Sequence, residues 1–201
     1  MSVITVSRQL GSMGRDVAVL VAQRMGYRFV WRDMINEAAR RASTPQVALA
    51  TIDELDILGI QPNAKDRKAY CAAISQIMNE LADADNVVIL GRAGQVVLAD
   101  HPYALHVRIV APVAIRIERI VRQMQVTPEA ALLQVDASDQ HRRDYLRRFY
   151  KQDWDDPALY DLTINTAHLS TSAVADIIWM TVATHHAPVP SDIGKGNLLS
   201  E

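Results

Sequence analysis

ITVSRQLGSMGRD, at residues 4–16, joins a short apolar run to two glycines and the start of a helical pattern. Glycines let backbone amides approach an oxyanion closely, and a helix N-terminus adds unpaired N–H groups and a partial positive charge. The stretch therefore has the outline of a phosphate-binding loop after a buried strand, although a purely structural strand-turn-helix corner is the alternative. The residues that would hold phosphate are Gly11, Ser12, Met13, Gly14, Arg15 and Asp16.

The loop departs from the common pattern G-x-x-x-x-G-K-[ST] at three positions. Gln9 stands at the first glycine, Arg15 at the lysine and Asp16 at the hydroxyl that binds magnesium. Arg15 can still supply charge and paired donors to phosphate oxygens. Asp16 is a candidate ligand for Mg²⁺, and the alternative is that it only stabilises the first turn of a helix.

The rest of the chain alternates strand-like and helical patterns. Short continuous apolar runs predict buried strands, and apolar residues at helical spacing predict helices. The predicted strands are 3–6, 87–90, 105–110 and 160–165, and the predicted helices are 14–25, a mostly helical span over 32–84, 112–125, 128–151 and 170–184. This order predicts an α/β domain of three layers with a mainly parallel sheet, whose ligands bind at the carboxyl ends of the strands.

The composition limits the class of protein. With 201 residues, 49% of them hydrophobic, the chain can form one domain with a substantial core, predicted over 1–184, and 185–201 is expected to be a flexible tail. A net charge of −2 gives no global field toward nucleic acid or an anionic membrane, so any anion site must be local. One cysteine, dispersed histidines and the lack of an export signal or of about 18 consecutive apolar residues favour a cytoplasmic protein without a metal centre.

A second candidate site follows the predicted strand at 87–90. Gly91 and Arg92 come directly after it, so Arg92 would lie at the carboxyl end of a strand, beside the exit of the first strand. A cation there is well placed to bind a second phosphate group, and the alternative is a surface arginine that opens a helix. The functional interpretation is favoured because two such strand exits occur in one sheet.

A third candidate site is the arginine-rich helix in DASDQHRRDYLRRFYKQDW, residues 136–154. Asp139 lies three and four residues before Arg142 and Arg143, so part of the charge is expected to be neutralised by pairs along the helix. The remaining arginines could close over a polyphosphate and stabilise the charge on a transferring group. A nucleic-acid-binding stripe is the competing use, but the balanced net charge and the 5% aromatic content disfavour it.

Four stretches of the chain together resemble the cytidylate kinase-like family of P-loop nucleoside monophosphate kinases, and the resemblance extends over about residues 3–182. The stretches are SRQLGSMGRD, VVILGRAG, LHVRIVAPVAIRIERI and DQHRRDYLRRFYKQDWDDPALYDLTINT. The resemblance implies a three-layer P-loop NTPase fold with a helical lid at about 127–156. It also implies a phosphotransferase that uses ATP and Mg²⁺ and moves the γ-phosphoryl group to a nucleoside monophosphate, with CMP or dCMP favoured. The expected partner is this small nucleotide, with neither nucleic acid nor membrane.

The resemblance also assigns roles to residues. Arg15, Arg142 and Arg143 would be catalytic, because they would offset charge on the transferring phosphoryl group. Arg92 would bind the phosphate of the acceptor, and Asp33 would lie at the edge of the acceptor pocket. Asp16 would hold the magnesium ion.

Two departures from the family pattern concern the acceptor. Ala93 replaces an aspartate that follows the Gly-Arg of cytidylate kinases, and Trp31 stands where relatives tend to carry an acidic residue. Two alternatives therefore remain open. One is a module of the same fold that holds a nucleotide without transferring phosphate, and the other is a small-molecule kinase with a non-nucleotide acceptor.

Overall fold

The computed structural model describes residues 2–31, 37, 41, 64–84 and 86–184. Its elements are β1 (Val3–Arg8), α1 (Gly14–Met25), β2 (Arg28–Val30), α4 (Ala64–Asp83), β3 (Val87–Leu90), α5 (Gly94–Val97), β4 (Ala104–Val110), α6 (Val113–Met124), α7 (Pro128–Tyr150), β5 (Leu162–Asn165) and α8 (Thr171–Thr184). The predicted helical span over 32–84 is confirmed where the chain is described from residue 64 onward, and most of its earlier part lies outside the described residues. The sequence did not predict β2, because its three residues are too few to show a strand pattern.

The five strands form one parallel sheet in the order β2-β3-β1-β4-β5. β1 lies in the centre, and Val3 pairs with Val87 of β3 on one side and with Ala104 of β4 on the other. The chain crosses from one side of β1 to the other after β3. The loops after β1 and β3 therefore meet at the carboxyl ends of the strands, the place where open α/β sheets bind ligands.

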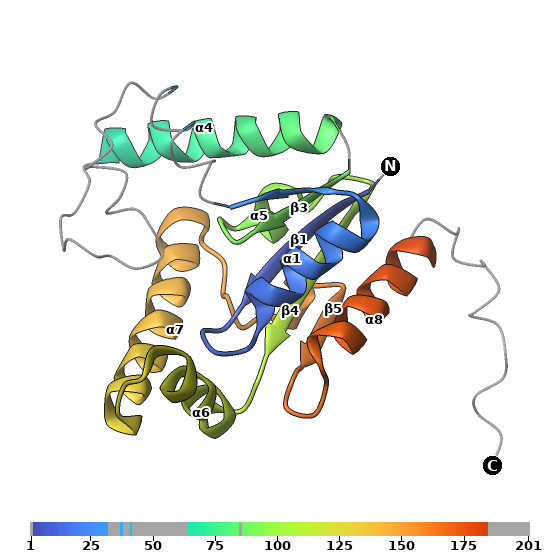
Figure 1. Cartoon of the computed structure of the whole chain (residues 1–201). Helices are drawn as coiled ribbons and strands as arrows, with labels where there is room; N and C mark the ends of the chain where they lie inside the picture. The colour runs from blue at the N-terminus through green and yellow to red at the C-terminus, as the bar shows by residue number, and fades with distance from the viewer. Residues whose placement is uncertain (1, 32–36, 38–40, 42–63, 85, 185–201) are drawn as a thin grey trace, which may run out of the picture.

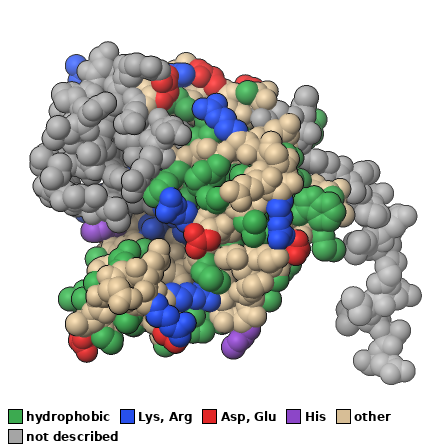
Figure 2. Space-filling view, in the orientation of Figure 1, with side chains coloured by type: hydrophobic (Ala, Val, Ile, Leu, Met, Phe, Trp, Pro, Cys, Tyr) green, Lys and Arg blue, Asp and Glu red, His purple; other side chains and the backbone are tan. Residues whose placement is uncertain are grey.

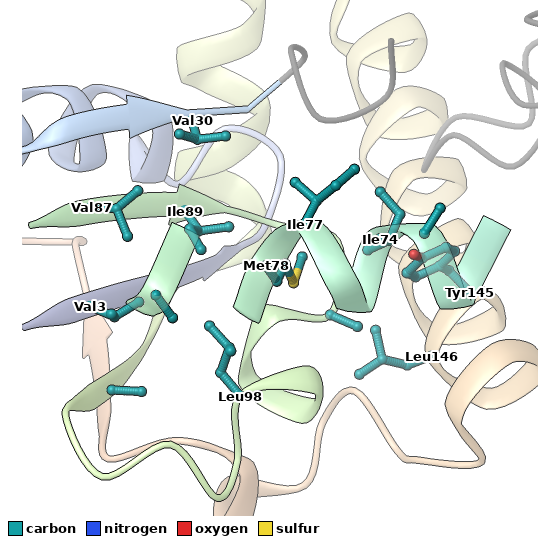
Figure 3. Packing of buried hydrophobic residues seen from close by; sticks show 14 of the residues in the cluster. Val3, Val30, Ile74, Ile77, Met78, Val87, Ile89, Leu98, Tyr145 and Leu146 are labelled. Carbon is teal, nitrogen blue, oxygen red and sulfur yellow. The ribbon is translucent and has the colours of Figure 1, made fainter. Parts of the chain in front are cut away.

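Helices cover both faces of the sheet (Figure 1). Side chains alternate between the faces along each strand, so Val87 and Ile89 point to α4 while Val88 and Leu90 pack with α1 and α8. Figure 3 shows the first of these cores, in which Ile74 and Met78 of α4 meet the sheet. The three layers predicted from the sequence are confirmed.

The helical pair α6 and α7 lies beyond the carboxyl end of β4 (Figure 1). A small core of Ile120, Ala131 and Val135 joins the two helices. The end of α7 is anchored differently, because Tyr145 and Leu146 are buried in the core beneath α4. α7 lies within the expected helical lid at about 127–156, and its C-terminal end therefore anchors that lid to the main core. No helix in the described part of the chain is long and apolar enough to cross a membrane.

Candidate active site

The loop between β1 and α1 is packed so closely that its glycines cannot be replaced without movement. Gly11 has a φ of 77°, and a Cβ there would lie 2.8 Å from the carbonyl oxygen of Arg116. At Gly14, a Cβ would lie 2.4 Å from the Cβ of Arg8. Because glycine fits both places, α1 can begin close against the end of β1. The N-terminal amides of α1 then lie at the carboxyl end of the sheet, where they can bind an anion.

Hydrogen bonds fasten this loop to β4 and to the segment after β5. The Ser12 hydroxyl donates to the Gln9 carbonyl at 2.8 Å, and the Gln9 side-chain oxygen accepts from the Ala111 amide at 3.0 Å. The Thr166 hydroxyl donates to the Ser12 carbonyl at 2.9 Å. Gln9, which replaces the usual first glycine, therefore anchors the loop, and Ser12 is fully buried within it.

The turn after β3 holds three successive residues in the left-handed region. Gly91, Arg92 and Ala93 have φ values of 79°, 59° and 57°. Residues other than glycine seldom adopt this conformation, and such strain is typical of functional turns. The turn buries the Arg92 side chain, which is 2% exposed, at the switch point of the sheet. Ala93, buried beside it, begins the short helix α5.

A cavity of about 360 Å³ lies where these loops meet α6 and α7. Five of its lining residues are arginines and one is acidic: Arg8, Arg15, Arg92, Arg119, Arg142 and Asp16. Figure 2 shows basic side chains gathered between the start of α1 and the α6–α7 pair. A cavity of this size with a strong excess of positive charge suits a small polyanion, and the loop amides add further donors.

Hydrogen bonds position two of these arginines. Arg119 donates to the Gly11 carbonyl at 3.2 Å and to the Thr166 carbonyl at 2.6 Å. Burial lowers the pKa of Arg119, but an arginine still remains cationic at neutral pH. Arg142, 6% exposed, donates to the Ser138 carbonyl at 3.0 Å. Their charges are thus built into the wall of the cavity.

Arg143, the next residue on α7, belongs to a different group of side chains. We call this group the Asp155 cluster; its members are Arg108, Arg143, Trp154, Asp155 and Tyr160. The Asp155 carboxylate accepts from Arg143 at 2.7 Å and from Arg108. The Arg108 guanidinium lies 4.8 Å from the Trp154 ring centroid and 5.4 Å from that of Tyr160. Trp154 in turn donates to the Ser7 hydroxyl of β1 at 2.9 Å.

Both arginines of the Asp155 cluster are paired with its one carboxylate. Burial acts to raise the pKa of the Asp155 carboxyl, but hydrogen bonds from Arg143 and Arg108 outweigh it and hold that pKa below its ordinary value. The hydrogen bond to Asp155 raises the pKa of Arg143. The cluster therefore fastens α7 and the segment after it to β1 and β4.

The structure brings most of the sequence-predicted residues to one place; Ser12 is buried within the loop beside them. Lining the cavity are Gly11, Met13, Gly14, Arg15, Asp16, Arg92 and Arg142. Arg143 is not among the lining residues, so its phosphate-clamping role stays a prediction. Asp33 lies outside the described residues. The expected pairing of Asp139 along its own helix is replaced by an ion pair with Arg116 of α6, at 2.9 Å.

Sequence reasoning missed two arginines of the cavity, Arg8 and Arg119. Arg119 lies on α6, which follows β4 directly, so the signal was a third strand exit in the stretch VAPVAIRIERI. Arg8 ends β1 itself and was counted as part of the loop.

Among the described residues, no group of three or more His, Cys, Asp and Glu side chains could hold a metal ion. Asp16 is the single carboxylate among the residues that line the cavity. A magnesium ion at Asp16 would therefore need further oxygen ligands from phosphate and water, which is how Mg²⁺ commonly binds.

Known proteins resemble this chain in sequence. The model of the cytidylate kinase-like family matches residues 3–168. Among curated relatives, the cytidylate kinase of Sulfolobus acidocaldarius is 27% identical over 176 residues, which cover 87% of this chain and 91% of that protein. Two other relatives match over only part of their length. The chain spans 29% of a uronate isomerase of Corynebacterium glutamicum, at 25% identity, and 40% of the cytidylate kinase of Halobacterium salinarum, at 34% identity.

Solved structures share the fold. A crystal structure of a protein from Eubacterium ventriosum has a TM-score of 0.73 at 18% identity and covers 92% of this chain and 99% of its own. Shikimate kinase from Acinetobacter baumannii, solved in complex with shikimate, has a TM-score of 0.52 at 17% identity and covers 93% of this chain and 96% of its own. The fold is the three-layer P-loop kinase fold, and the family match spans most of the chain. This chain belongs to the cytidylate kinase-like family.

Proposed function

We propose that this protein is an ATP-dependent phosphotransferase that moves the γ-phosphoryl group to a nucleoside monophosphate, with CMP or dCMP as the favoured acceptor. The observation that carries the proposal is the cavity lined by five arginines and one carboxylate at the N-terminus of α1. The cytidylate kinases among the relatives supply the acceptor class.

The residues at the cavity fit a nucleoside triphosphate. Amides of the loop 11–16 and the start of α1 would hold the β- and γ-phosphates, as helix N-termini commonly do. Arg15 would add a bidentate contact in place of the usual lysine. Asp16, exposed at the edge of the cavity, would hold the magnesium ion, which supplies charge neutralisation on the phosphate oxygens when bound.

The acceptor would bind on the side of the cavity formed by β2 and β3. Arg92, turned inward by its strained backbone, would contact the acceptor phosphate. Asp33, shortly after β2, would lie near the acceptor's base. Trp31 lines the cavity on this side and would border the acceptor as well.

The chemistry asked of these residues is positioning and charge stabilisation. Arg15 and Arg142 would offset the charge spread over the oxygens of the transferring group, and Arg119 would support them from α6. No general base is required, because the attacking oxygen of a phosphate monoester is already anionic at neutral pH. The α6–α7 pair would exclude water from the cavity.

Two sets of residues each favour a function other than nucleoside monophosphate kinase. Arg15 in place of the lysine, together with Ala93, favours a module that binds nucleotide without transfer. Trp31 at the acceptor side favours a kinase with a non-nucleotide acceptor.

A coupled kinase assay with ATP and Mg²⁺ tests the proposal against both rivals. The acceptors are CMP, dCMP, UMP, AMP and simple alcohols, and calorimetry measures ATP binding in parallel. Turnover with CMP or dCMP above the other acceptors is the expected result. Binding of ATP without turnover on any acceptor would leave only the binding module, and turnover with an alcohol alone would leave only the small-molecule kinase.

A further inference from the structure

Trp31 and Arg15 contact each other at the rim of the cavity. Trp31 follows the last residue of β2 and is half-buried, and Arg15 is exposed in the first turn of α1. The guanidinium carbon of Arg15 lies 4.9 Å from the centroid of the Trp31 ring. Both side chains line the cavity. Arg15 departs from the common phosphate-loop pattern, which has a lysine there, and Trp31 departs from the family pattern, which tends to have an acidic residue. In the fold the two residues are neighbours.

A tryptophan is the strongest aromatic partner for a cation, and a separation below about 6 Å is within the range of the interaction. Stacking uses the flat face of the guanidinium, whereas its five N–H donors point outward from the edge. An arginine held by its face on Trp31 can therefore still donate to phosphate oxygens. A lysine ammonium has no flat face, so the same group would have to contact the ring and donate to phosphate.

Hydrogen bonds to oxygen acceptors hold two other arginines of this cavity, and Arg142 also lies 6.0 Å from the centroid of the Trp154 ring. Arg119 is bonded to the carbonyls of Gly11 and Thr166, and Arg142 to Ser138. Arg15 instead sits on an exposed first turn and carries a long side chain with many rotamers, whose ordering costs free energy when a ligand binds. A fixed aromatic surface beside it would remove part of that cost.

We propose that Trp31 is a positioning residue that holds the guanidinium of Arg15 toward the cavity, so that Arg15 meets the phosphate chain of the ligand already oriented. The proposal deepens the phosphotransferase function and rests on it for the identity of the ligand. It gives the tryptophan at the acidic position a role toward the arginine that stands at the lysine position.

A double-mutant cycle on phosphate binding tests the proposal. Inorganic tripolyphosphate is the probe, because it has no base that could stack on Trp31, and calorimetry measures its affinity for wild type, Arg15→Ala, Trp31→Leu and the double variant. Trp31→Leu is expected to weaken binding about three- to fivefold, the range of a partly exposed cation–π pair. In the Arg15→Ala background, Trp31→Leu is expected to leave the tripolyphosphate affinity nearly unchanged, because the effects of two coupled residues do not add.

Two matched variants separate positioning from packing. Trp31→Phe keeps an aromatic face and is expected to retain most of the affinity, whereas Trp179→Leu removes an exposed tryptophan on α8 and should leave it unchanged. Equal losses from Trp31→Leu in both backgrounds, or no loss in either, would overturn the proposal. A loss of ATP affinity with unchanged tripolyphosphate affinity would also overturn it and would make Trp31 a surface for the base.

A measurement without ligand or turnover keeps the proposal apart from the kinase function. The NMR resonance of the Arg15 Nε–H should lie upfield in wild type, because it sits over an aromatic ring, and should return to an ordinary position in Trp31→Leu. An ordinary position in wild type would refute the contact even if the protein proved to be an active kinase. The upfield shift and the coupled losses in affinity, found with no transfer to any acceptor, would sink the kinase proposal and leave Trp31 as positioning Arg15 for binding alone.

Discussion

Two groups of arginines lie side by side in this protein and differ in what surrounds them. In the cavity, five arginines share the lining with one aspartate. In the Asp155 cluster, Arg108 and Arg143 bond to the same carboxylate, and Arg108 also contacts the rings of Trp154 and Tyr160. The first group has charge to offer a ligand, and the second uses its charge within the fold.

Arg142 and Arg143 show this difference at adjacent positions of α7. Successive residues of a helix point about 100° apart, so two neighbours can face different surroundings. Arg142 faces the cavity, and Arg143 faces Asp155. Trp154 lies between the groups, about 6 Å from both guanidinium carbons. One arginine-rich helix can therefore supply one arginine to a cavity and the next to contacts that stabilise the fold.

Trp154→Ala is expected to have the largest effect, because Trp154 supports both groups. Its indole is 1% exposed and donates to Ser7, so its removal leaves a large cavity and takes away one hydrogen bond to the Ser7 hydroxyl. The free energy of unfolding should fall by about 3–5 kcal/mol, which chemical denaturation monitored by circular dichroism measures. Trp154→Phe should lose clearly less, and an unchanged denaturation midpoint for Trp154→Ala would show that the two groups do not depend on it.

The turnover of Arg15→Ala, compared with that of Arg143→Ala, tests whether the two groups of arginines differ in function. Turnover with the best acceptor should fall about 100-fold, the scale of losing one donor that stabilises a transition state. Arg143→Ala, assayed where it is folded, should keep turnover within about threefold, because Asp155 holds its guanidinium away from the cavity lining. An equal loss in both variants would support the phosphate-clamping role predicted for Arg143.

Asp155→Asn tests how much the Asp155 cluster contributes to the stability of the fold. Arg108, 8% exposed at its side chain, would lose a charged partner, but Asp155 is 41% exposed, so solvent screens part of the loss. A decrease of about 1–2 kcal/mol in the free energy of unfolding is expected at neutral pH. No decrease would mean that solvent already replaces the carboxylate.

The same variant has a definite dependence on pH. The pKa of Asp155 is lowered in the folded state from 3.8, so its stabilisation is complete above that value and is lost as the pH falls through the folded pKa. The difference in stability between wild type and Asp155→Asn should be constant from about pH 5 to 7 and shrink below about pH 4. A difference that grows on acidification would contradict this assignment.

A change in salt concentration should also distinguish the two groups of arginines, and its effect is expected to be the smallest of those predicted. The affinity of the cavity for ATP should fall a few-fold as NaCl rises from about 0.05 to 0.3 M, because ions screen the attraction between the anionic ligand and the excess positive charge of the cavity. The stability of the folded protein should change little over the same range, since ions screen direct contacts such as those of Asp155 less than attraction over longer distances. Salt-independent ATP binding would argue against a cavity that works by its arginines.

Much of the fold followed from the sequence, because buried parallel strands leave continuous apolar runs and the helices between them keep their spacing. The loop 11–16 and Arg92 were located because each follows such a run directly. Arg119 was missed because it lies on a helix, where an arginine usually faces solvent. The different surroundings of Arg142 and Arg143 could not be predicted, because Asp155 is distant enough along the chain that only folding brings it to one of them.

Calorimetric titration of ATP with Mg²⁺ into wild type, Arg142→Ala and Arg143→Ala tests the central claim most directly. If the cavity is the phosphate site, wild type binds ATP, Arg142→Ala weakens the affinity by at least about tenfold, and Arg143→Ala changes it by no more than about threefold. Absence of binding in wild type, or equal losses in the two variants, would contradict the account.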